Sequence, residues 1–479
     1  MIDSKTRAKY RPTIGIECHV QLKTKTKLFA AVGNDAREAP PNTLVSHICF
    51  GLPGSLPVLN AEVIHLASRA AFALNSTPQH FSKFDRKHYF YPDLPMGYQI
   101  TQYDEPIVLG GSVEIVVDGE RKSVGITRAH LESDAGKSTH PAGSDYSLVD
   151  LNRAGTPLLE IVSEPDMHSS AEVKAYAREL YLSMRYADVS DANLYYGNMR
   201  FDVNVSVSQT DELGTRSETK NLNSFKSVER AVDYEIERQI ERLEKGQRIV
   251  QETRGWDDAK QKTLSQRSKE NADDYRYMPD PDLPPIVIED DYIARIKAEM
   301  PDLPADYRQK FQAINIDAAV IEDIVSVPET AKLVAKILVE GNAEHARRVA
   351  FWMMQPSADE ADQVEEQSVN EEQLIKLSQL VGDNKLSSTA AKVVLAELLK
   401  SGGDAETIAA DKNLLQVSDE GEIAAIVEKV LTDNPEASQD VKNGEMKAIG
   451  FLIGQVMKAS QGKANPSLAQ DLIKKQLEL

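Results

Sequence analysis

The stretch Gly15-Ile16-Glu17-Cys18-His19-Val20-Gln21-Leu22 alternates between polar and apolar side chains. Successive side chains of a β-strand point to opposite faces, so Glu17, His19 and Gln21 would share one face. The alternation therefore predicts a strand with one buried and one polar face. A carboxylate and an imidazole two residues apart on that polar face suit a divalent cation, and a merely solvated strand face is the alternative.

Two later stretches add further possible metal ligands. His130 and Glu132 begin residues 130–138 and would share one face of an extended segment. Glu160 lies in the otherwise apolar run 157–162, where a carboxylate is costly unless it is paired or bound to a cation. Taken alone, Glu160 is also compatible with a strand end that faces water.

Residues 199–206 form another alternating stretch. Arg200, Asp202 and Asn204 would share one face, and Lys220 follows as a possible phosphate partner. Residues 83–91 mix basic and aromatic side chains, which suits contact with a nucleotide or RNA but is also ordinary at a domain surface.

Residues 136–138 resemble the end of a P-loop, the glycine-rich phosphate-binding motif. Leu131 stands where that motif needs its first glycine, so we reject a P-loop. Any ATP site in this chain must therefore use another architecture.

The first 290 residues have the sequence patterns of a mixed α and β domain. Short β-branched runs at 113–117, 158–162 and 203–207 predict strands, and Asp118-Gly119 predicts a turn after the first. Helical spacing of apolar residues predicts helices at 172–186 and 227–243. Closely spaced prolines in residues 278–285 exclude a helix there, so we expect the first domain to end near this segment.

Beyond residue 291 the strand patterns fade, and alanine, leucine, glutamate and lysine dominate, as helices prefer. The pair Gly402-Gly403 indicates a hinge. We therefore expect an α+β protein with three parts: a mixed or antiparallel-sheet domain at 1–290 and all-helical domains at 291–402 and 403–479.

Composition excludes several classes of protein. The chain has 479 residues and only two cysteines, which cannot form a disulfide framework or a four-cysteine zinc site and favour the cytoplasm. No apolar run reaches about 18 residues, so we expect no membrane span. The net charge of −20 argues against general attraction to nucleic acid, although a local basic face could still bind it.

Taken together and in order, the motifs resemble a known family. The chain is similar to the GatB family, the B subunits of the aspartyl/glutamyl-tRNA(Asn/Gln) amidotransferases. The stretches that carry this resemblance are residues 15–22, 51–60, 83–102, 130–140, 147–166, 199–206, 220–225, 251–254 and 273–285. The helical parts are similar to that family's cradle domain and its tRNA-binding tail domain.

The resemblance implies an activity. The chain would be a ligase that forms a carbon–nitrogen bond, with glutamine as the amido donor, on misacylated Glu-tRNA(Gln) or Asp-tRNA(Asn) or both. ATP and Mg²⁺ would serve to phosphorylate the side-chain carboxylate, and ammonia would then displace phosphate. A partner glutaminase subunit of the amidase family would supply the ammonia, and a small third subunit would complete a heterotrimer.

The resemblance also implies the site residues. Glu17, His19, Glu132 and Glu160 would hold the metal and take part in catalysis. The residues implied to lie beside the nucleotide are Arg200, Asp202, Asn204 and Lys220.

This chain departs from the family pattern at four positions. Ser133 stands where the family usually has a glutamate, and Met96 where it usually has a lysine. Tyr195 and Tyr196 replace residues that are usually acidic. The resemblance places the Ser133 position near the family's route for ammonia, and the sequence leaves open whether ammonia delivery is altered here.

Two other functions are compatible with the residues. One is a stand-alone ligase that joins a small-molecule carboxylate to an amine. The other is a tRNA-binding subunit without catalysis, in which departures such as Ser133 mark lost activity. ATP hydrolysis that depends on misacylated tRNA would separate these alternatives from the amidotransferase.

Overall fold

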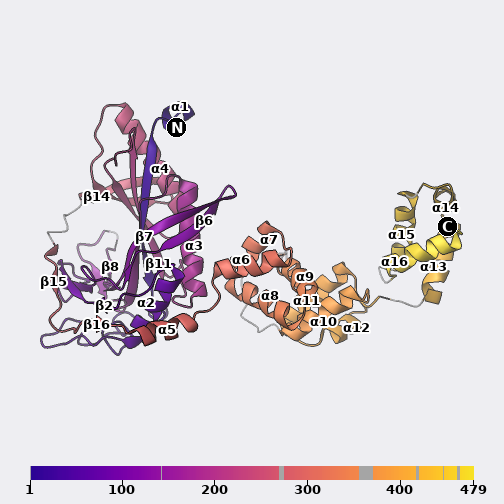
Figure 1. Ribbon diagram of the computed structural model, residues 1–479, viewed down its shortest axis with the longest axis horizontal. Helices are drawn as coiled ribbons and strands as arrows, with labels where there is room; N and C mark the ends of the chain where they lie inside the picture. Colours follow the sequence, from indigo (N-terminus) through magenta and orange to yellow (C-terminus); the bar gives the residue numbers. More distant parts are fainter. Residues whose placement is uncertain are drawn as a thin grey trace. The chain divides into compact units, whose positions relative to one another are not determined.

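The computed structural model describes residues 2–141, 143–268, 275–354, 370–416, 420–445, 447–460 and 464–479. The 273–285 motif therefore begins two residues outside the described part of the chain. The chain divides into two compact units, Met1–Pro304 and Ala305–Leu479 (Figure 1).

The first unit is built on one large sheet, whose strands follow the order β14-β13-β12-β11-β1-β10-β7-β4-β3-β15, with β5 and β6 also paired to β7. Its pairs are antiparallel except β12 with β13, which are parallel. The predicted mixed or antiparallel sheet is confirmed. Its strands are β1 (Arg11–Gln21), β3 (Asp85–His88), β4 (Tyr98–Thr101), β5 (Val108–Leu109), β6 (Ser112–Val117), β7 (Glu120–Ser133), β10 (Pro157–Ser163), β11 (Met199–Ser208), β12 (Ser217–Leu222), β13 (Glu252–Asp257), β14 (Lys262–Ser268) and β15 (Met278–Pro279).

Two small two-stranded sheets accompany the large one. They pair β2 (Phe81–Ser82) with β16 (Ile286–Val287) and β8 (Lys137–Thr139) with β9 (Leu148–Asp150).

The hairpin between β6 and β7 turns where the sequence predicts it. Asp118 and Gly119 have positive φ angles of 52° and 84°. Two such residues in a two-residue loop match the twist of antiparallel strands, which is why Asp-Gly is favoured there. The strands predicted at 113–117, 158–162 and 203–207 lie within β6, β10 and β11.

The apolar face of the sheet packs against helices. Ile14, Ile16, Cys18 and Val20 of β1 are at most 1% exposed and join one hydrophobic core with residues of α3 (Ser170–Tyr186) and α4 (Phe225–Glu244). These helices, labelled in Figure 1, are the two predicted ones. Each is slightly longer than expected. The other helices of this unit are α1 (Ser4–Arg7), α2 (Ala61–Ala73) and α5 (Asp290–Ala298).

Capping explains where these two helices begin. The hydroxyl of Ser169 accepts a hydrogen bond from the backbone N–H of Glu172, and that of Ser224 accepts one from Ser227. A serine at the N-cap satisfies a backbone donor that lacks a helical partner. With α3 and α4 covering the apolar face, the polar side chains of β1 are left on the other face.

Among the described residues of the second unit, every named element is a helix, as the sequence predicts. With the fold class thus confirmed, the chain is an α+β protein. The helices are α6 (Pro304–Ala313), α7 (Ala318–Val325), α8 (Pro328–Glu340), α9 (Ala343–Met353), α10 (Glu371–Gly382), α11 (Ser388–Ser401), α12 (Ala405–Asp411), α13 (Glu420–Asp433), α14 (Pro435–Lys442), α15 (Lys447–Ala459) and α16 (Pro466–Gln476).

The packing of the last helices bears on the proposed tail domain. Gly402 and Gly403 follow α11 with φ angles of 66° and 109°, so the backbone is left-handed at the residues where the sequence predicts a hinge. However, α12 still packs against α10 and α11. The separate core of Val427, Leu452 and Leu472 belongs to α13, α15 and α16. We therefore keep the three-domain division as a proposal, with the tail core starting at α13.

None of the described helices has both the length and the apolar character needed to cross a membrane.

Candidate active site

Strand register creates a row of polar side chains across the open face of the sheet. His19 on β1 lies opposite Glu160 on β10 and opposite Arg200 on β11. Glu160 in turn lies opposite His130 on β7. Residues paired across neighbouring strands project from the same face, so alternation within each strand and register between strands together assemble the row.

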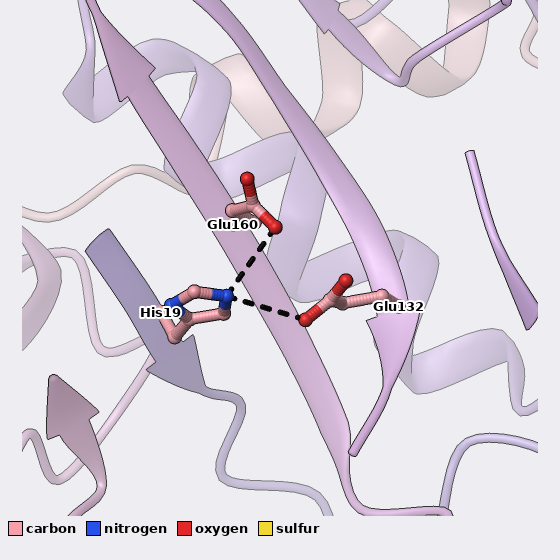
Figure 2. A group of neighbouring side chains, drawn as sticks. All are labelled: His19, Glu132 and Glu160. Carbon is pink, nitrogen blue, oxygen red and sulfur yellow. Dashed lines mark ion pairs between the residues drawn. The ribbon is translucent and has the colours of Figure 1, made fainter. Parts of the chain in front are cut away.

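Three of the predicted metal ligands converge. The Nε2 atom of His19 is 3.4 Å from a carboxylate oxygen of Glu132 and 3.3 Å from one of Glu160. One ligand atom from each residue lies within 4.8 Å of the others. Figure 2 shows the two carboxylates pointing toward the histidine ring from adjacent strands. Together they line a pocket of about 590 Å³.

The charges of this cluster are strongly coupled. Burial alone would lower the pKa of His19, but the hydrogen bond and charge of Glu160, with the charge of Glu132, raise that pKa to about 9. Burial and the neighbouring Glu160 raise the pKa of Glu132 to about 7. Burial also opposes ionisation of Glu160, yet the imidazoles of His130 and His19 hold its pKa well below the usual value.

These residues fit a divalent cation. Without one, two close carboxylates are held together by the positive charge of His19, and a cation could take over that role. Two carboxylates and one imidazole leave coordination positions open for water or phosphate oxygens, as Mg²⁺ requires when it works with a nucleotide. An imidazole ligand also suits Mn²⁺ or Zn²⁺.

Glu17, the fourth predicted ligand, does not join the cluster. Its carboxylate accepts a hydrogen bond from the Asn204 side-chain amide at 2.9 Å. Both residues line a separate pocket of about 300 Å³. The structure thus separates Glu17 from His19, although the two share one face of β1. The role of Glu17 as a ligand stays a prediction.

Three of the four residues predicted to lie beside the nucleotide line the larger pocket. Lys220 pairs with Asp202 at 2.8 Å, and Arg200 pairs with Asp134 at 3.1 Å. The charge of Asp134 raises the pKa of Arg200. Asn204 lies instead with Glu17 in the smaller pocket.

The structure brings to the site residues that the family resemblance does not imply. His130 is buried, and its Nε2 atom is 3.5 Å from Glu160. Burial lowers the pKa of His130 to about 4, although the charge of Glu160 opposes this effect. Lys87 and Tyr89 of the 83–91 stretch also line the larger pocket. The mixture of basic and aromatic side chains in residues 83–91 indicated a possible ligand contact. Nothing in the sequence showed that this stretch would lie near Glu132.

The four positions at which the sequence is expected to depart from the family pattern fall in two places. Ser133 and Met96 line a small cavity of about 40 Å³. Tyr195 and Tyr196 line the pocket of the metal-ligand cluster, and Tyr195 is 90% exposed.

Comparison with known proteins identifies the family. Residues 12–294 match the model of the GatB/GatE catalytic domain. This chain belongs to the GatB family. A second match, to the GatB domain, covers residues 332–477. The GatB catalytic match includes every predicted site residue, from Glu17 to Lys220.

Curated GatB relatives align along almost the whole chain. Each is named as the B subunit of an aspartyl/glutamyl-tRNA(Asn/Gln) amidotransferase. The protein of Synechococcus sp. (strain JA-2-3B'a(2-13)) is 44% identical over 98% of both chains. That of Caldanaerobacter subterraneus subsp. tengcongensis is 45% identical, and that of Desulfotalea psychrophila 43%, each over 98% of this chain and 99% of the relative. The resemblance inferred from the motifs is therefore confirmed.

Proposed function

We propose that this chain amidates misacylated Glu-tRNA(Gln), Asp-tRNA(Asn) or both, using ATP and ammonia from a partner subunit. The observation that carries the proposal is the convergence of His19, Glu132 and Glu160 in the catalytic domain of a GatB-family chain. The names of the relatives, which describe subunits of tRNA amidotransferases, support tRNA-dependent amidation over the two alternatives.

The chemistry requires an activated carboxylate. A side-chain carboxylate oxygen of the misacylated residue attacks the γ-phosphorus of ATP, and ADP leaves. Ammonia then attacks the acyl carbon, and phosphate leaves with one of the ammonia protons. His19, Glu132 and Glu160 would hold Mg²⁺, which offsets phosphate charge during such transfers. Arg200 and Lys220, already paired with Asp134 and Asp202, would help to place the nucleotide.

Partners follow from the same proposal. The relatives are each named as one subunit of an amidotransferase, which implies an assembly of several chains. We propose a glutaminase subunit of the amidase family as the ammonia source, and a small third subunit. In this proposal, helices α13–α16, which share their own core, contact the body of the tRNA.

The decisive experiment uses the assembled enzyme. We would measure ADP formation that depends on misacylated tRNA for the parent and for Glu132→Gln. The variant should keep tRNA binding but lose tRNA-dependent ADP formation. Glu120→Gln is the matched control, because Glu120 is exposed at the far end of the same strand, β7. Parent-level activity in Glu132→Gln would show that the cluster is not the phosphorylation site.

A further inference from the structure

Lys87 differs from Arg200 and Lys220, two other cationic side chains that line the larger pocket. Arg200 and Lys220 each have a carboxylate oxygen within 3.1 Å. Lys87 lines the same pocket, yet none of the described carboxylates comes within the 4.0 Å of an ion pair with its ammonium. Its Nζ atom lies instead over the rings of Tyr275 and Tyr89, 4.9 Å and 5.8 Å from their centres.

Register places Lys87 on the same face as the metal-ligand cluster. Lys87 on β3 pairs with Gln99 on β4, and Thr101 on β4 pairs with Glu132 on β7. Gln99 and Thr101 are two residues apart, so they project from the same face. Since paired residues also share a face, Lys87 and Glu132 lie on one side of the sheet, with β4 between their strands.

The negative charges of Glu132 and Glu160 favour the protonated, charged form of Lys87. Burial would lower the pKa of this lysine, but the charges of Glu132 and Glu160 outweigh that effect and raise it. An ammonium that is half-buried and has no ion pair among the residues that the structure describes bears a cost of desolvation that those residues do not offset with a carboxylate. The faces of two tyrosine rings offset part of that cost without neutralising the charge.

The Lys87 ammonium is suited to bind an anion. An ammonium has three N–H donors and acts as a compact point charge for phosphate. The tyrosine rings hold the lysine side chain in place while leaving its charge for a ligand. Lys87 lines the same pocket as His19, Glu132 and Glu160, so an anion bound there could contact both the ammonium and a cation held by those three residues. The transferring phosphoryl group is such an anion.

We propose that Lys87 binds the phosphoryl group in transfer, first as the γ-phosphate of ATP and then as the acyl phosphate. The inference deepens the proposed function and rests on it. As the bond from phosphorus to the oxygen of ADP breaks and the bond to the substrate carboxylate forms, Lys87 keeps its protons and stabilises the equatorial phosphoryl oxygens. When ammonia displaces phosphate, the carbon–oxygen bond breaks, and the departing phosphate takes the third ammonia proton.

The first test is kinetic and uses the assembled enzyme. Lys87→Met keeps the length of the side chain and removes its charge. It should lower kcat/KM for ATP by about 100-fold or more, as the loss of one preorganised donor to a transition state does. The KM for misacylated tRNA should change by less than about threefold. Lys87→Arg should recover part of the activity, because a cation is restored.

A matched control separates charge loss from general damage. Lys122→Met also removes one lysine, which lies on β7 and pairs with Glu172 at 2.8 Å. It should keep the parent kinetics. A defect in Lys87→Met confined to the KM for misacylated tRNA would mean that Lys87 reads the substrate carboxylate, and the proposal would be overturned. Parent kinetics in Lys87→Met would also overturn it.

A binding test does not depend on amidation. Isothermal titration would measure Mg²⁺ complexes of ADP and of the β,γ-methylene analogue of ATP. Lys87→Met should bind the analogue at least about tenfold more weakly and bind ADP like the parent, because only the analogue carries a γ-phosphate. Equal loss for both ligands, or none, would refute the γ-phosphate contact. Absence of tRNA-dependent ADP formation in the parent would instead refute the proposed function.

Discussion

The buried carboxylate of Glu235 ties helix α4 to the strands that carry Lys220 and its neighbours. Its side chain is 0% exposed and accepts hydrogen bonds from Ser217 at 2.8 Å, from Arg254 at 3.0 Å and from Arg238 at 2.7 Å. The Thr263 hydroxyl also donates to it. These donors come from α4, β12, β13 and β14, so one carboxylate joins four elements.

Replacing this carboxylate with an amide should destabilise the first unit strongly. Glu235→Gln leaves the charges of Arg238 and Arg254 without their buried partner and turns an N–H donor toward them. Removing one member of a buried ion pair costs about 3–5 kcal/mol. Because the amide keeps one acceptor oxygen, we expect about 3 kcal/mol, more than about a 100-fold change in the unfolding equilibrium.

Fluorescence can report this change in the first unit alone. The chain has two tryptophans, Trp256 in the first unit and Trp352 in the second. Trp256 lies beside α4, with its ring centre 6.3 Å from that of Tyr234. In a Trp352→Phe background, guanidinium titration followed by fluorescence should show a lower midpoint for Glu235→Gln. An unchanged free energy of unfolding at pH 7 would refute the reasoning.

A surface pair and a pH series serve as controls. Glu229→Gln removes the partner of Lys174, a part-exposed pair at 2.8 Å, and should cost less than about 1 kcal/mol. Burial would raise the pKa of Glu235, but Arg238 and the other donors lower it overall. A carboxylate whose pKa is lower in the folded state contributes its full stabilisation of the fold at pH values above the unfolded-state pKa of about 4.3. This contribution is lost as the pH falls through the folded-state pKa. The difference between parent and Glu235→Gln should therefore be constant near neutral pH and shrink in acid.

Three further outcomes follow from the site and the helical unit. His130→Ala should weaken Mn²⁺ binding about 10–100-fold, because His130 holds Glu160, and titration calorimetry that finds parent affinity would contradict that role. The isolated chain should release no glutamate from glutamine, since Cys18 and Cys49 are both buried, and a coupled glutamate assay would expose the opposite result. Deleting residues 420–479 should raise the KM for tRNA while leaving Mn²⁺ affinity unchanged, whereas an unaltered KM would remove the tail from tRNA recognition.

Much of the fold could be predicted because its signals are local. The alternation of residues 15–22 reflects the two-residue repeat of a strand, and the structure buries Ile16, Cys18 and Val20 as that repeat requires. Helical spacing likewise identified α3 and α4, and Asp118-Gly119 identified the hairpin turn. The family motifs then supplied the metal-ligand set, since no single stretch was decisive.

The sequence by itself determined which polar side chains share a strand face, because that depends only on neighbours along the chain. Only the tertiary structure decided which of them meet. His19 lies opposite Glu160 and close to Glu132 because β1, β10 and β7 pair in that order and register. Glu17, two residues away on the same face, lies with Asn204 instead. Lys87 lines the same pocket as the cluster because β4 pairs with both β3 and β7. Register is fixed by pairing between distant segments and by burial of the opposite face, so local patterns do not contain it.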